Sequence, residues 1–514
     1  MPNIDRDFMW LSNLDTKRRN NYLEPELDDK THFIHAVEED IISNAIYLDF
    51  ALRYIPIDTI GMSSSCRTIM EALILIEASD SGMIPGENYK RFRDEYVFIE
   101  YSNGKRLFEL LPDYAGEGSF KKLSEEYDSL SKKYCDELGL KQSEFGRFAK
   151  DPMFVFFKKG DHSLEDFNYL VKKFRPDWID NYHFLGMEIH PRFLRDEKLE
   201  KKERKQVKEL SISMLTKAVG YLKEKYKKEM EEGEAKSLTE TVNDPLYYGP
   251  WFIPINKEIE VFQAFLAHAV MLPTVSDSYT LYTMEKLTYL YYGMESMAIL
   301  GFSEHAAMKF KSAIELISYY YLIEKAKDGL DAFNALKEAF RVSSEIQYRQ
   351  LLNENNQDFE TLFDRLKAVY ESYYQKRYHA TFDEFKDNIC HNGKYFFSEN
   401  KSFSYRKLVQ TFLEDYLGGN ELDRRNILCV YDTSIDMEHA GGYLMESSIG
   451  PWEQNCQIVM KFFQDFFLIW MSDVISTKRD AGESTEELEK CMKAYQAMTN
   501  LFEELRAAAI ETHR

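Results

Sequence analysis

CRTIMEALILIE, the stretch from Cys66 to Glu77, is an apolar segment that carries a charged pair and no helix-breaking residue. A second stretch, FKSAIELISYYYLIE from Phe310 to Glu324, resembles it. The two align at an offset of 244 positions, which pairs Arg67 with Lys311 and Glu71 with Glu315. Residues four apart share one face of a helix. Both stretches therefore predict an apolar helix with one ion pair along it, and their likeness predicts an internal repeat.

Two further segments recur in the same order along the chain. The segment from Ser143 to Val171 resembles that from Asp383 to Val409, and YHFLGMEIHP from Tyr182 to Pro191 resembles YDTSIDMEHA from Tyr431 to Ala440. The second alignment pairs Tyr182 with Tyr431 and His190 with His439. The offsets drift only from 238 to 249 positions, which is far longer than the period of a solenoid repeat. We therefore expect a domain duplication, with any functional site at the seam between the copies or mirrored across it.

The composition predicts an all-α protein. The chain of 514 residues has only 23 Gly and 13 Pro, so residues that break helices are scarce. Aromatic residues make up 15% of the chain, which favours broad contacts between helices. The expected organisation is an N-terminal arm over residues 1–30, a first helical unit over 31–235, an aromatic linker over 236–256 and a second helical unit over 257–514.

Charge and motif content exclude several functional classes. The net charge of −22 opposes general nucleic-acid or membrane binding, and the basic stretch from Phe193 to Leu210 is interpreted as a solvated helix face. The six cysteines include no CxxC pair, so neither a zinc site nor a disulfide framework is expected. Signal-peptide, membrane-span and glycine-rich nucleotide patterns are missing from the sequence. We expect a cytoplasmic protein without a metal or other cofactor, and one that can form homo-oligomers.

The repeated polar residues resemble those of bacterial all-α domains related to the HEPN superfamily. The residues that carry this resemblance in the first copy are Arg67, Glu71, the RFRDEY stretch from Arg91 to Tyr96, Tyr182 and His190. Their counterparts in the second copy are Lys311, Glu315, Arg341, Tyr431, Ser434 and His439. The resemblance implies two helical bundles packed about a pseudo-twofold axis. It also implies metal-independent ribonuclease chemistry, in which an Arg–His motif from each bundle meets its mate in one cleft.

The sequence departs from that active-site pattern. The nearest internal match to the Arg–His motif is Lys386 followed by His391, and it occurs in the second copy only. His190 and His439 are the more symmetric candidates, because each follows a tyrosine by eight positions. Positions eight apart on a helix lie about 80° apart around its axis, so tyrosine and histidine would flank one pocket.

Two functions therefore remain open. One is a toxin-type or antiviral-defence ribonuclease acting on RNA at the cleft between the copies, with Lys386 and His391, or His190 and His439, as catalytic residues. The other is a non-catalytic helical sensor or scaffold that binds a partner protein or a small ligand, with Tyr182, Tyr431 and the Arg67–Glu71 and Lys311–Glu315 pairs as binding residues. Each such i,i+4 pair can also be a buried ion pair that fixes the helix register.

Overall fold

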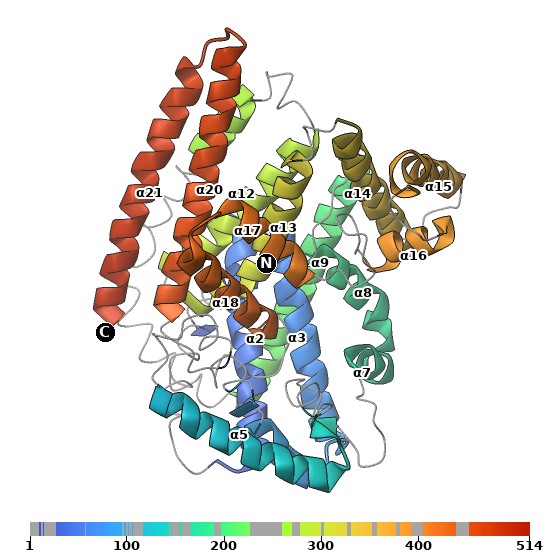
Figure 1. The fold of residues 1–514 in the computed structure, drawn as a ribbon. Coiled ribbons are helices and arrows are strands. Elements are labelled where there is room, and N and C mark those ends of the chain that lie inside the picture. The colour runs from blue at the N-terminus through green and yellow to red at the C-terminus, as the bar shows by residue number, and fades with distance from the viewer. Residues whose placement is uncertain are drawn as a thin grey trace.

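The computed structural model of the protein describes residues 10–11, 14, 27–56, 58–94, 97–98, 101, 105, 117–142, 145, 155–156, 166–189, 197–226, 260–269, 278–299, 303–325, 330–351, 357–376, 381–392, 405–437 and 452–513. All regular secondary structure in these residues is helical, which confirms the all-α prediction (Figure 1). Within these ranges, no helix combines the length and the apolar character needed to cross a bilayer. Most of the predicted arm and the whole of the predicted linker lie outside them.

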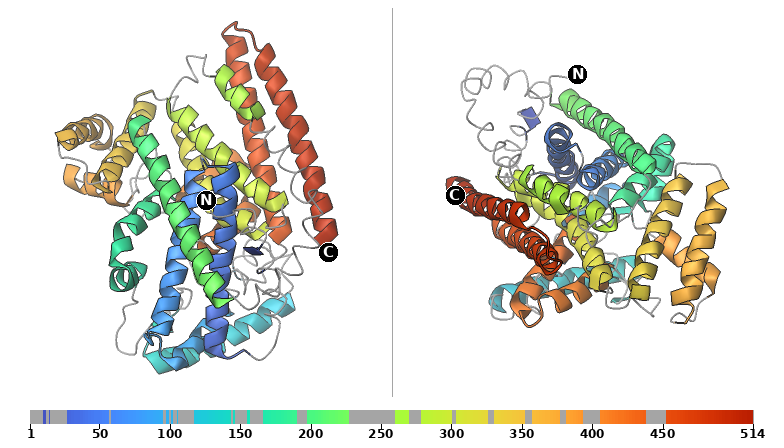
Figure 2. Two further views of the ribbon diagram at one scale, coloured as in Figure 1. Left: turned by 180° about the vertical axis from the view of Figure 1, so that it is seen from behind. Right: turned by 90° about the horizontal axis from the view of Figure 1, so that it is seen from above.

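A first group of helices is built around α3. It comprises α2 (Asp29–Tyr54), α3 (Thr59–Asp80), α7 (Phe167–Phe174), α8 (Ile179–Glu188) and α9 (Glu197–Lys225). The Asp28 carboxylate begins α2 by accepting hydrogen bonds from the backbone N–H groups of Lys30 and Thr31, and Asp58 begins α3 by accepting one from Gly61. These contacts satisfy donors that have no partner within the helix. α3 packs against α2, α7, α8 and α9, so it is the central helix of this group (Figure 2).

A second group is built in the same way around α13. It comprises α12 (Ser278–Ile299), α13 (Ser303–Lys325), α17 (Tyr405–Tyr416), α18 (Glu421–Met437) and α20 (Trp452–Asp480). α13 packs against α12, α17, α18 and α20. In each group the central helix comes second along the chain and packs against the other four.

The remaining helices extend the two groups outward. They are η1 (Gly86–Asn88), α5 (Glu117–Leu138), η3 (Pro176–Trp178), α14 (Leu330–Leu351), α15 (Gln357–Val369), the π-helical turn η5 (Tyr370–Tyr374), α16 (Phe382–Asn392) and α21 (Glu486–His513). In Figure 1, α15 and α16 lie beyond α14 at one side of the molecule, and the α20–α21 pair stands at the other. α5 crosses below the first group, where a small separate core gathers around Phe98 and Phe145.

The two groups meet at a seam formed by α2 and α3 on one side and α12 and α13 on the other. The contacts across it are reciprocal: α3 touches α12, α2 touches α13, and the two central helices touch each other. One continuous hydrophobic core runs through both groups. The first and second groups therefore share their interior.

Candidate functional site

The first group brings together three of the polar residues that the sequence singled out. Arg67 and Glu71 lie on α3, with Arg67 Nε 3.1 Å from Glu71 Oε1. Tyr182, on α8, donates its hydroxyl to Glu71 Oε1 at 2.7 Å and accepts from Arg67 Nη2 at 3.2 Å. Glu71 and Tyr182 are buried. Burial and the nearby Glu71 carboxylate raise the pKa of Tyr182, so its hydroxyl stays protonated and acts as a donor.

The second group repeats this contact at the corresponding positions. Tyr431, on α18, donates its hydroxyl to Glu315 Oε1 on α13 at 2.9 Å, and both side chains are fully buried. Lys311 lies one turn before Glu315 and is also buried. Ser434 donates to the Tyr431 carbonyl at 2.8 Å, and Arg341 is bonded within α14 to Glu345. In both groups a tyrosine thus tethers an outer helix to a carboxylate on the central helix.

The candidate histidines lie at the limits of the described structure. α8 ends at Glu188, and His190 is outside the described residues. His439 is also outside them, because α18 is described as far as Met437. His391 falls on α16, where the structure describes the backbone but not this side chain.

Lys386 lies on α16, the same helix as His391. Figure 1 shows this helix beyond α14, at one side of the molecule. Its Nζ is 3.4 Å from Asp383 Oδ1 and 5.3 Å from the centre of the Phe363 ring. α16 packs on α14, whereas the seam is formed by α2, α3, α12 and α13. The structure therefore places Lys386 on the outer flank of the second group.

A buried polar cluster at the seam was not predicted from the sequence. Lys309, on α13, extends into the first group, where its Nζ donates to Ser65 Oγ at 2.7 Å and lies 4.7 Å from the centre of the Tyr47 ring. All three side chains are buried. Ser65 and Lys309 are separated by 244 positions, the same offset that pairs Arg67 with Lys311. Extending that alignment by two positions toward the N-terminus pairs Ser65 with Lys309, but the pairing by itself does not predict that the two side chains touch.

The Tyr47 hydroxyl is enclosed by both groups. It donates to the Asp58 carboxylate at the start of α3, and it faces two glycines that leave room for it. A Cβ atom would lie 2.2 Å from this hydroxyl if built on Gly61 and 2.5 Å from it if built on Gly293 of α12. Burial raises the pKa of Asp58, an effect opposed by its bonds to Tyr47 and Gly61 and by Lys309.

Lys286 forms the second link across the seam. Its Nζ, on α12, contacts Glu203 Oε1 of α9 at 2.5 Å and also donates to Thr59. Burial by itself lowers the pKa of Lys286, but attraction to Glu203 and Glu188 outweighs it and keeps the amine protonated. Burial likewise raises the pKa of Glu203, but Lys286 outweighs that effect and keeps the carboxylate ionised. A buried ion pair therefore joins α12 to the first group.

The burial and bonding of the seam cluster favour a structural role, in which it holds the two groups together. Lys309, Tyr47, Asp58, Lys286 and Glu203 are each less than a tenth exposed. Tyr47 is bonded to Asp58, Lys286 to Glu203 and Lys309 to Ser65, whereas a catalytic acid or base must reach a substrate proton. The nearby Cys66 thiol has its pKa raised to about 12 by burial, so it is not an activated nucleophile.

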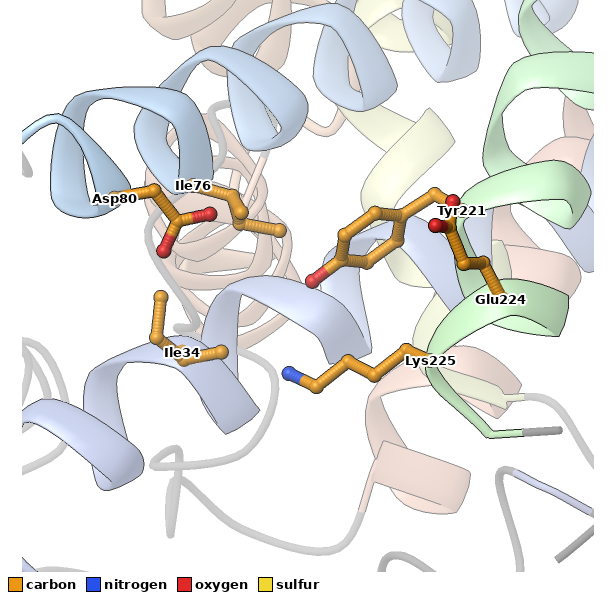
Figure 3. A pocket seen from close by; sticks show the side chains of 6 residues that line it. All are labelled: Ile34, Ile76, Asp80, Tyr221, Glu224 and Lys225. Carbon is orange, nitrogen blue, oxygen red and sulfur yellow. The ribbon is translucent and has the colours of Figure 1, made fainter. Parts of the chain in front are cut away.

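An open pocket lies at the outer edge of the first group, between α2, α3 and α9 (Figure 3). Its volume is about 360 Å³, and its lining residues are Ile34, Ile76, Asp80, Tyr221, Glu224 and Lys225. This volume lies at the lower end of the range for small-molecule sites. Figure 3 shows the Tyr221 hydroxyl, the Lys225 amine and the Asp80 carboxylate facing a common space beside the two isoleucines.

The polar floor of the pocket is held by Glu38, a fully buried residue of α2. Its carboxylate accepts hydrogen bonds from Tyr221 and Tyr226, both at 2.7 Å, and forms an ion pair with Lys225. Burial, followed by the nearby Glu38 carboxylate, raises the pKa of Tyr221. The positive charge of Lys225 is thus matched inside the protein, while Asp80 and Glu224 are exposed at the mouth.

A metal site does not form among the described residues, since no group of three His, Cys, Asp or Glu side chains there could hold an ion. His32, at the start of a His-x-x-His-x-x-x-Glu pattern, is buried with its ring 5.9 Å from that of Phe92. No protein-family model, curated protein or solved structure matches this chain. Functional assignment therefore depends on the geometry of the side chains.

Proposed function

We propose that this chain is a non-catalytic binding protein built from two HEPN-like helical units that arose by duplication and are locked together at the seam. The observation that carries the proposal is the state of the seam cluster. Lys286 and Lys309 of the second unit are buried in the first and are bonded to its hydroxyl and carboxylate groups. Buried charges bonded in this way fix the relative position of the units.

Two matched contacts support the duplication. The Tyr182–Glu71 bond has its counterpart in Tyr431–Glu315. The ring centres of Tyr134 and Phe145 lie 6.3 Å apart, and those of Tyr374 and Phe385, each 240 positions later, lie 4.7 Å apart. In addition, α9 and α20 each contain 29 residues and pack on their central helices.

A pseudo-twofold relation is supported by the contact between Ser65 and Lys309. Around a twofold axis, a residue near the axis touches its own counterpart, and other contacts occur in reciprocal pairs. Ser65 and Lys309 occupy matched positions and touch each other. The α3–α12 and α2–α13 contacts form the expected reciprocal pair.

The binding function is supported by the pocket between α2, α3 and α9. It offers an apolar wall from Ile34 and Ile76, an aromatic ring from Tyr221, and carboxylates at its mouth. Small-molecule sites combine an apolar lining with a few convergent polar groups in this way. A ligand bound there would contact all three long helices of the first unit, and so would stabilise that unit as a whole.

A second candidate is the ribonuclease, and one observation favours it. The Lys386 side chain is 30% exposed, so its ammonium group can meet a phosphate. Against it, Lys386 and His391 are five positions apart on one continuous helix. Such positions are separated by about 140° around the axis of a regular helix, so a regular helix does not place them on one face.

A paired experiment tests the proposal. The purified chain is incubated with single-stranded and structured RNA in the presence of a chelator, alongside His391→Ala, His190→Ala and His439→Ala. It is also screened by thermal shift against cationic, anionic and neutral small molecules. We expect no cleavage and at least one class of ligand that raises the melting temperature. Cleavage that disappears in any of the histidine variants would overturn the proposal and establish the ribonuclease.

A further inference from the structure

We infer that the pocket between α2, α3 and α9 binds a small organic cation, an alkylammonium or guanidinium group on a short aliphatic chain. This inference rests on the proposed binding function and names the ligand class for that site. The ligand class follows from the charged groups at the pocket. One of them is paired with a buried carboxylate of the protein, whereas others are exposed at the mouth, where a ligand can reach them.

The donors at the floor of the pocket are engaged by the protein itself. Tyr221 donates to Glu38 at 2.7 Å, and Lys225 forms an ion pair with the same carboxylate. Glu38 is fully buried, whereas the Lys225 side chain is 36% exposed. The carboxylate therefore fixes the amine to the wall. An anionic ligand would have to compete with Glu38 for Lys225.

The carboxylates at the mouth of the pocket, unlike the donors at its floor, are exposed to solvent. Asp80 ends α3 and Glu224 lies in the last turn of α9, and both are exposed. In Figure 3 the Asp80 carboxylate points toward the space in front of Tyr221. With Glu38 beneath Lys225, the three carboxylates outnumber the single ammonium group by two charges. The field in the pocket therefore attracts a cation, and the net charge of −22 adds to it at long range.

The apolar lining of the pocket suits an aliphatic chain as the uncharged part of the ligand. Ile34 and Ile76 form an aliphatic wall opposite the Tyr221 ring. An aliphatic chain can lie along these isoleucines, and an ammonium or guanidinium group is attracted to the face of an aromatic ring. With a volume of about 360 Å³ the pocket suits a ligand no larger than a diamine or agmatine.

The test uses the full chain and three probes of similar length: agmatine, pentanoate and 1,5-pentanediol. Binding is measured by isothermal titration calorimetry at about 20 mM and at about 300 mM salt. We expect agmatine to bind with a Kd of about 1 mM or below, as its size allows, and to bind more weakly at high salt because the carboxylates are exposed. Pentanoate and the diol should bind at least tenfold more weakly.

The variant Asp80→Asn/Glu224→Gln should weaken agmatine binding by roughly fivefold or more, since it removes two charges near the ligand. The matched control Asp128→Asn/Glu209→Gln removes the same net charge from exposed sites on α5 and α9 outside the pocket, and it should bind agmatine like the wild type. Equal weakening by both variants would show attraction to the net charge alone and overturn the inference.

The remaining outcomes separate this inference from the proposed function. Pentanoate binding that is lost in Lys225→Gln would overturn the ligand class while leaving a binding protein. If no molecule of any class binds or raises the melting temperature, the binding function fails as well. Circular dichroism of each variant shows whether a loss of binding reflects a loss of fold.

Discussion

At the scale of single residues, the space around the Tyr47 hydroxyl is the most restrictive feature of the seam. A Cβ on Gly293 would lie 2.5 Å from this hydroxyl, closer than side chains normally approach. We expect Gly293→Ala to destabilise the protein by about 1–3 kcal/mol, the usual cost of overpacking. Urea unfolding measures the change.

Two controls isolate the cause of that destabilisation. Gly220 lies on α9, where a Cβ would meet nothing within 4 Å, so Gly220→Ala should raise stability by roughly 0.5–1 kcal/mol through helix propensity. In a Tyr47→Phe background the hydroxyl is gone, and the cost of Gly293→Ala should shrink. An equal cost in both backgrounds would refute the steric explanation.

Asp58 should make stability depend on pH. Burial raises its pKa in the folded protein above the ordinary value of 3.8, so the folded state holds this proton more tightly than the unfolded chain. Its contribution is fully present below pH 3.8 and is lost as the pH rises through the folded pKa. The stability of the wild type relative to Asp58→Asn should therefore fall as the pH rises from about 4 toward 7. Urea unfolding of both proteins across this range measures it, and a difference that does not change with pH would contradict the raised pKa.

At the scale of helices, the two tyrosine–glutamate bonds attach α8 to α3 and α18 to α13. Tyr182→Phe and Tyr431→Phe each remove one hydrogen bond to a buried carboxylate, and each should cost about 1–3 kcal/mol. Hydrogen exchange should accelerate in α8 for the first variant and in α18 for the second. Exchange that increases equally in both helices for either variant would show that the bonds do not act locally.

The helices themselves follow closely from the sequence. A glycine stop and a Ser-Thr start around residues 482–485 predict a boundary between two helices, and the last two helices occupy Trp452–Asp480 and Glu486–His513. Caps, glycine stops and apolar periodicity are local signals, so they can be read from a single chain. The repeat marked Arg67, Glu71 and Tyr182 as candidate binding residues, and the structure brings the three side chains together.

The seam cluster and the pocket could not be foreseen in this way. Lys286 and Lys309 are charged residues, which by themselves indicate an exposed helix face. Their burial depends on acceptors supplied by the other unit, such as Glu203, which lies 83 positions away. The pocket likewise needs three helices whose crossing is set by packing, which is not encoded in the periodicity of any one of them.

At the scale of the whole molecule, the continuous core predicts that both units unfold together. Calorimetry should show one transition whose calorimetric and van't Hoff enthalpies agree. Lys286→Met leaves Glu203 buried without its ion-pair partner, which should cost about 3–5 kcal/mol. Adding Glu203→Leu should recover most of that loss. A single variant as stable as the wild type would show that the ion pair does not join the units.

The reciprocal seam also bears on how the chain can be divided. A protease cut between residues 226 and 260 would leave the first and second units as separate fragments, still in contact through Lys309 with Ser65 and Lys286 with Glu203. A covalent link between two partners can give an effective concentration in about the millimolar range. The two fragments should therefore complement each other when mixed at high concentration. The effect of each seam substitution could then be measured as a change in the dissociation constant of the two fragments.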